Sequence, residues 1–150
     1  MRPIVVDVPG AAAVVLDSPH SGVFYPDDFR HCCDFAMLRG AQDTHVEKLY
    51  DFAPAMGVAW IEAIEAAHAG HGYSIHVNCH SMMPAVASQF GTVRCYGDPA
   101  RDRHGVQVEV NRRLYMDEKT LEPPAGFDRL RSDLKEMVAM LLETDPRSLG

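Results

Sequence analysis

Apolar and polar positions alternate along the chain in short blocks, which predict strands separated by helices. Strands are predicted at residues 11–16, 73–78, 93–96 and 106–110. The first is an unbroken apolar run, as in a buried parallel strand, and the second and fourth alternate apolar and polar residues. Helical spacing of apolar residues predicts helices at 35–56, 60–69 and 127–142. This order indicates an α/β fold with a mixed, largely parallel sheet.

Length and composition fit one domain over residues 1–150, with 47% hydrophobic residues for a core. The net charge of −7 argues against nucleic acid or an anionic membrane as partner. With neither a signal peptide nor an apolar stretch that would span a bilayer, we expect a cytoplasmic protein. The four cysteines fit reduced thiols, and Cys79 is predicted as a buried apolar residue rather than a nucleophile.

Two histidines lie close to the predicted carboxyl ends of strands. His20 is in residues 16–22 (LDSPHSG), and His80 is in residues 78–82 (NCHSM). Ligands of open α/β sheets bind beyond the carboxyl ends of the strands, so both histidines are candidate metal ligands. A single histidine in a loop, however, more often binds no metal.

Carboxylates that could act in a metal site, as a ligand or as a general base, occur on two predicted elements. Asp43, Glu47 and Asp51 recur four residues apart on the predicted helix, a spacing that by itself favours a solvated acidic face. Two imidazoles and one carboxylate form a recurring catalytic zinc set, and His45 stays open as an alternative ligand. Glu109 lies on the polar side of a predicted strand, where it is either a general base or part of a wet edge.

Four segments together resemble the N-formylglutamate amidohydrolase (N-formylglutamate deformylase) family. They are LDSPHSG with Tyr25-Pro26, Gln42-Asp43 through VEKLYDFAPAMG, NCHSM, and HGVQVEVNRRLYMDE. The segments keep the family's order, from about residue 14 to the last helix. The resemblance implies a three-layer α/β domain similar in fold to zinc carboxypeptidases, shortened by two internal deletions.

The resemblance also implies the residues of a site. Zinc would be held by His20, Asp43 and His80, and Glu109 would activate water. Arg112, Arg113 and Ser21 are the expected substrate-binding residues, with Arg113 on the side of Glu109 if the strand continues.

The implied reaction releases formate from N-formyl-L-glutamate, in histidine degradation. The expected partner is therefore a small anionic N-acyl amino acid. Three alternatives stay open. They are a non-catalytic metal-binding remnant, a zinc deacylase of another N-acyl amino acid, and a structural domain without metal. A homo-oligomer that covers exposed sheet edges is also open.

Overall fold

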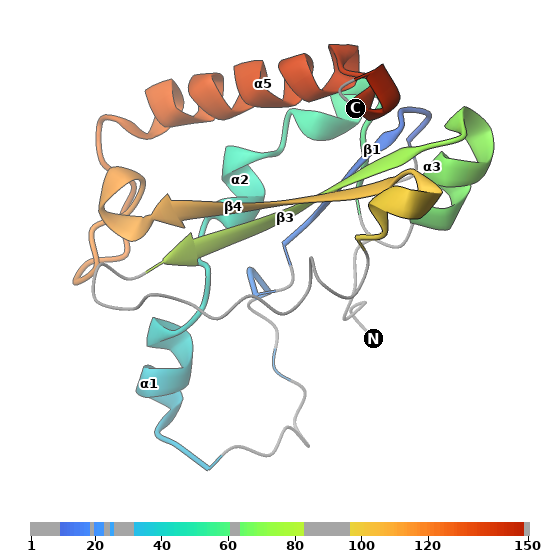
Figure 1. The fold of residues 1–150 in the computed structure, drawn as a ribbon. Coiled ribbons are helices and arrows are strands. Elements are labelled where there is room, and N and C mark those ends of the chain that lie inside the picture. Colours follow the sequence, from blue (N-terminus) through green and yellow to red (C-terminus); the bar gives the residue numbers. More distant parts are fainter. Residues whose placement is uncertain are drawn as a thin grey trace.

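The computed structural model of the chain contains one sheet of parallel strands (Figure 1). It describes residues 10–18, 20–22, 25, 32–60, 64–82 and 97–148. The strands are β1 (Val14–Asp17), β2 (Ala59–Trp60), β3 (Ser74–Met82) and β4 (Arg103–Asn111), and their order in the sheet is β2-β1-β3-β4. Every neighbouring pair runs parallel, so the carboxyl ends of the strands lie at one edge of the sheet.

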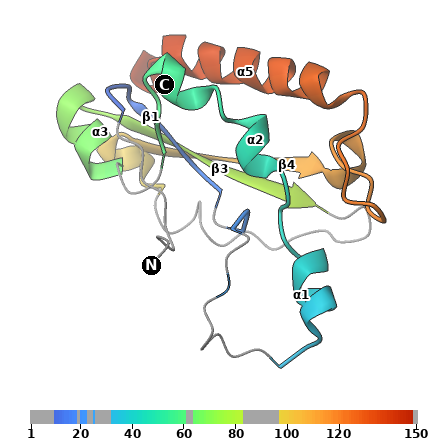
Figure 2. The ribbon, with the colours of Figure 1, turned by 180° about the vertical axis from the view of Figure 1, so that it is seen from behind.

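Helices lie on both faces of this sheet. The helices of the described residues are α1 (Phe35–Gly40), α2 (Val46–Leu49), α3 (Ile64–His71) and α5 (Phe127–Glu143), with 3₁₀ turns at Ala53–Met56, Pro99–Arg101, Arg112–Leu114 and Pro146–Ser148. In Figures 1 and 2, α2 and α5 lie on the same side of the sheet, whereas α1 projects away from it. Ala67 of α3 packs against the opposite side. The three-layer α/β architecture is thus confirmed.

Strand β1 shows how the sequence sets these layers. Val14 and Leu16 belong to the main core, beneath α2 and α5. Val15 points the other way and packs with Ala59 and with Ala67 of α3. Successive side chains of a strand point to opposite faces. An unbroken apolar run therefore suits a strand that is covered on both sides.

Strands β3 and β4 combine one apolar face with one polar face. Ile75, Val77 and Cys79 lie in the main core, which confirms Cys79 as a buried apolar residue. His76, Asn78 and His80 alternate with them and point to the other face. In the register with β4, His80 pairs with Glu109, and paired residues of parallel strands point to the same face. The polar face therefore carries two of the predicted site residues.

The predicted helix over residues 35–56 is wrong, because the segment is divided into α1, α2 and a 3₁₀ turn. The backbone leaves helical geometry after Gly40, and His45 has a left-handed φ of 69°. Pro54 lies in the 3₁₀ turn, where its missing N–H costs no helical hydrogen bond. Asp43 consequently lies in the turn between α1 and α2 and not on a helix.

Two other predicted boundaries also differ from the structure. The predicted helix at 60–69 begins instead as strand β2, and α3 starts at Ile64 and continues to His71. Strand β3 continues past Asn78, so His80 lies within the strand rather than beyond its end. The apolar residue at Cys79 extends the alternation and explains the longer strand. The strand predicted at 93–96 lies outside the described residues.

The long amphipathic helix is confirmed as α5. Leu134 and Val138 are buried one turn apart, and Phe127, Leu130 and Leu141 pack against the same core. Among the residues that the structure describes, no helix has the length and apolar character to cross a membrane.

Candidate metal centre

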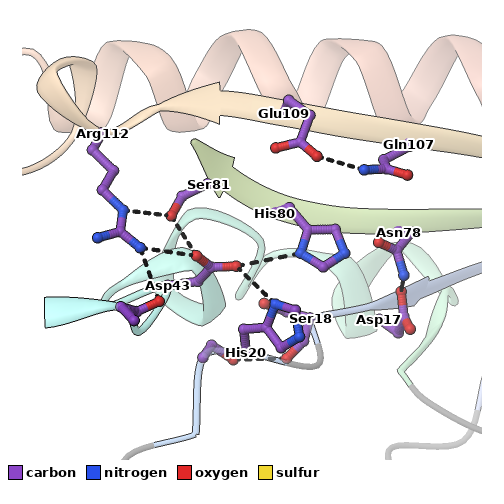
Figure 3. A network of polar contacts seen from close by, with 12 residues as sticks. Asp17, Ser18, His20, Asp43, Asn78, His80, Ser81, Gln107, Glu109 and Arg112 are labelled. Carbon is purple, nitrogen blue, oxygen red and sulfur yellow. Dashed lines mark hydrogen bonds and ion pairs between the residues drawn. The ribbon is translucent and has the colours of Figure 1, made fainter. Parts of the chain in front are cut away.

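Three of the predicted site residues converge at the carboxyl-terminal edge of the sheet (Figure 3). The Nδ1 atom of His80 lies 3.4 Å from Oδ2 of Asp43, and Nδ1 of His20 lies 3.8 Å from the same oxygen. The two imidazole rings are neighbours, with centroids 4.9 Å apart. Two histidines and one carboxylate from three separate segments therefore face a common point.

Backbone and side-chain contacts hold the two loops of the site together. The N–H of Asp43 donates to the carbonyl oxygen of His20 at 3.0 Å. The Gln42 side-chain amide donates to the Gly22 carbonyl at 2.7 Å. Ser21 closes its own turn, because its hydroxyl donates to the Ser18 carbonyl. The turn after β1 and the turn before α2 are thus joined directly beside the site.

The two oxygens of Asp43 have different surroundings. Oδ1 accepts a hydrogen bond of 2.5 Å from the Ser81 hydroxyl and a longer one of 3.4 Å from Arg112. Oδ2 is buried and, within the described residues, has no donor with hydrogen-bond geometry, although it faces the two imidazoles. A buried carboxylate oxygen without a hydrogen bond is costly, unless another positive group completes its surroundings.

The charges of the site favour an ionised carboxylate beside an imidazole. Burial raises the pKa of Asp43, but the contacts with His80 and Ser81 and the charge of His20 lower it by more, so the net pKa lies below the ordinary value. The contact with Asp43 raises the pKa of His80, burial opposes this, and the negative charges of Glu109 and Asp17 add to the increase. Asp43 is therefore available as an anionic ligand.

The spacing of the three side chains fits a divalent metal ion. Zinc bonds to imidazole nitrogen and carboxylate oxygen are about 2.0–2.2 Å, so tetrahedral ligand atoms lie about 3.3 Å apart. One ligand atom from each of His20, Asp43 and His80 lies within 4.8 Å of the other two. The group is slightly wider than this ideal, and the His20 side chain, which is 64% exposed, has room to turn inward. The buried Oδ2 of Asp43 is suited to be the anionic ligand of such an ion.

Glu109 approaches the same place from the neighbouring strand. It is the register partner of His80 and lies above the His80 ring in Figure 3. Its Oε1 accepts a hydrogen bond of 2.5 Å from the Gln107 amide. Glu109 is half-buried and is not one of the three converging ligands. Its position beside them suits a proton-transfer role.

The structure places the two arginines differently from each other. Arg112 is buried and donates to Gly40, Ala41, Ser81 and Asp43. Its guanidinium is thus engaged by protein groups. The strand ends at Asn111 and a 3₁₀ turn follows, so the condition that would place Arg113 beside Glu109 does not hold. Arg113 is 72% exposed and lies 3.7 Å from Glu118. The substrate-binding roles of Arg112, Arg113 and Ser21 stay predictions.

His45, the alternative ligand, is not part of the converging group. Its Nε2 lies 2.8 Å from the Leu121 carbonyl oxygen, and its Nδ1 lies 3.0 Å from the Lys48 ammonium. A carbonyl oxygen accepts and an ammonium donates, so these partners assign the proton to Nε2. Both nitrogens of His45 therefore have partners away from the site.

Two further features of the site were not predicted. Ser81 follows His80 in the sequence, but only the fold shows that its hydroxyl bonds Asp43. Asp17 at the end of β1 accepts from the Asn78 amide at 2.8 Å and lies 3.1 Å from His76. The polar alternation of β3 was visible in the sequence and hinted at such a cluster, whereas the role of Ser81 had no sequence signal.

The fold and this site together define an α/β protein with a His-Asp-His group suited to a divalent cation. A sequence profile of one family, described as N-formylglutamate amidohydrolase, matches residues 12–63, which contain His20 and Asp43. No curated protein matches the chain.

A crystal structure of N-formylglutamate amidohydrolase from Ralstonia eutropha JMP134 has the same fold. Its TM-score is 0.78 at 21% identity, and the match covers 94% of this chain and 97% of that chain. The resemblance to the N-formylglutamate amidohydrolases is therefore confirmed, in sequence over the first part of the chain and in fold over nearly all of it. The match covers almost all of that chain, so it shows no deletion relative to that protein, and the two deletions relative to longer family members stay a prediction.

Proposed function

We propose that the chain is a metal-dependent hydrolase of an amide bond, with zinc held by His20, Asp43 and His80. The observation that carries the proposal is the buried Oδ2 of Asp43, which faces two imidazole nitrogens at 3.4 and 3.8 Å. This set of one carboxylate and two imidazoles is typical of catalytic zinc sites, which keep a position open for water. The family profile supports it, because its match includes two of the three ligands.

The chemistry of a metal ion in this group would be to polarise a carbonyl and to lower the pKa of a water molecule. Glu109 would take the proton from that water and transfer it to the leaving amine. Its Oε1 is held by Gln107, so we assign Oε2 to the proton transfer. Asp43 is fixed through Oδ1 and leaves Oδ2 for the ion.

The proposed substrate class rests on the resemblance to the N-formylglutamate amidohydrolases. We propose an N-acyl amino acid, with N-formyl-L-glutamate first, whose hydrolysis gives glutamate and formate in histidine degradation. Arg112 is engaged by protein groups, which leaves the exposed Arg113 as the first group to test for carboxylate binding, whereas Ser21 would have to give up its hydrogen bond to the Ser18 carbonyl to donate to a substrate.

The test combines metal content with formate release. The purified chain, saturated with zinc, should bind one equivalent per chain by elemental analysis and should release formate from N-formyl-L-glutamate. Glu109→Gln should retain zinc and lose activity by at least about 100-fold, as expected for a general base. His80→Ala should lose zinc, whereas His45→Ala, whose ring bonds Leu121, should retain it.

The outcomes separate the alternatives. Zinc without hydrolysis of any N-acyl amino acid would make the chain a metal-binding remnant. Hydrolysis of another N-acyl amino acid but not of the formyl compound would make it a different deacylase. If the chain binds no zinc, or if Glu109→Gln turns over normally, the proposal is wrong.

A further inference from the structure

Arg112, which the sequence predicted to bind substrate, instead donates four hydrogen bonds to protein groups beside the candidate metal site. It lies in the turn after β4 and is 5% exposed. Its Nε donates to the Ser81 hydroxyl, and its two terminal nitrogens donate to Gly40, Ala41 and Asp43. A guanidinium that serves four protein acceptors is poorly placed to bind a substrate carboxylate as well.

The carbonyls that Arg112 binds belong to the end of α1. The Arg112 distances to the Gly40 and Ala41 oxygens are 2.6 and 3.1 Å. Carbonyls in the last turn of a helix lack intrahelical partners, so a cation there satisfies them. α1 itself has no buried residue that would fix its end. The contacts of Arg112 therefore hold the segment that leads directly into Asp43.

The Arg112 side chain also contacts the carboxylate of Asp43 directly. Arg112 and Ser81 both donate to Oδ1, and Arg112 donates to Ser81 in turn, which closes a three-membered network. With Oδ1 held on this side, Oδ2 points at His20 and His80, as Figure 3 shows. Hydrogen-bonded partners of a metal ligand set the orientation of that ligand.

We propose that Arg112, together with Ser81, is a positioning residue that presents Oδ2 of Asp43 to the metal ion and does not bind substrate. The inference deepens the proposed function and rests on it. Arg112 acts through Asp43, so its loss changes metal affinity before it changes substrate affinity. Its neighbour Arg113 faces solvent and takes no part in this network.

The experiment measures zinc affinity by competition with a chromophoric chelator, for the unmodified chain and for Arg112→Met, Arg112→Lys and Ser81→Ala. Arg112→Met and Ser81→Ala should each weaken binding by about 10–100-fold, the usual effect of removing a partner of a ligand. Lysine keeps the charge but not the planar fork, so Arg112→Lys should recover part of the affinity. The absorption spectrum of the cobalt-substituted protein should change in the same variants.

Arg131→Met is the matched control, since Arg131 forms an ion pair with Asp51 on the surface. It should bind zinc as the unmodified chain does. Ser81→Ala removes a single hydroxyl and decides the question if Arg112→Met fails to fold. Variants with unchanged zinc affinity, or a raised KM at unchanged zinc affinity, would overturn the inference while leaving the proposed function intact. An unmodified chain that binds no zinc would overturn both.

Discussion

Replacement of Asp43 by asparagine tests the centre of the site with almost no change in volume. Asparagine can still accept at Oδ1 from Ser81 and Arg112, so the local network is retained in outline. It removes the negative charge and the second oxygen, which faces His20 and His80. The variant should therefore fold, with a loss of about 1–3 kcal/mol for the weakened buried contacts.

The expected size of the metal effect follows from linkage. Free zinc at about 100 times its dissociation constant stabilises the folded chain by about 2.7 kcal/mol. For a domain of this size each kcal/mol raises Tm by about 2–4 °C, so zinc should raise it by about 5–11 °C. If Asp43→Asn weakens zinc about 100-fold, the stabilisation at the same free zinc falls to about 0.4 kcal/mol, or about 1–2 °C.

The assay is thermal unfolding followed by circular dichroism, at fixed free zinc and again after chelation. Asp51→Asn is the matched control, because Asp51 lies on the same segment but is 56% exposed and pairs with Arg131. It should keep the full zinc-dependent rise. The same rise in Asp43→Asn as in the unmodified chain would refute the assignment of Oδ2 as a ligand.

Two further predictions concern the core. Leu49→Ala should lower the free energy of unfolding by about 2–5 kcal/mol, measured by urea denaturation, because Leu49 is fully buried. The surface control Leu114→Ala, at a 56% exposed side chain, should stay within about 0.5 kcal/mol, and equal losses would contradict the described core. Burial raises the pKa of the Cys79 thiol well above its ordinary value, so iodoacetamide at pH 8 should spare Cys79 in the native chain and modify the exposed Cys32. Mass spectrometry reads out the modification, and rapid native labelling of Cys79 would count against its placement.

The parts of the fold that the sequence predicted are those in which the hydrophobic period agrees with the final packing. Strand β4 and helix α5 have clean periods of two and about 3.6, and both are present. Strand β2 has two residues and was hidden in an apolar stretch that also suits a helix. The helix prediction for the segment that contains Asp43 was wrong for a different reason. Its apolar residues have helical spacing, but tertiary contacts and the left-handed His45 divide it.

The candidate site was predictable in identity and not in geometry. His20 and His80 could be named because each lies near the carboxyl end of a strand. Asp43 was named as a helical residue, although it lies in a turn that Arg112 fixes from 69 positions away in the sequence. A side-chain hydrogen bond between distant segments has no periodicity in the sequence. For this reason the contacts of Arg112 and Ser81 with Asp43 could not be predicted from the sequence.

The fold therefore holds two of the three side chains of the site in place, whereas the third lies in a surface turn. Asp43 and His80 have side chains that are 3% and 12% exposed, and strands, Ser81 and Arg112 fix them. His20 is 64% exposed, and its backbone is tied to Asp43 while its ring meets solvent. The ordering cost of the proposed metal binding would therefore fall mainly on one imidazole, which would lose rotamer freedom on turning inward. Loss of His20 should weaken zinc binding less than loss of Asp43, because Asp43 contributes both the charge and the buried oxygen around which the other two proposed ligands are arranged.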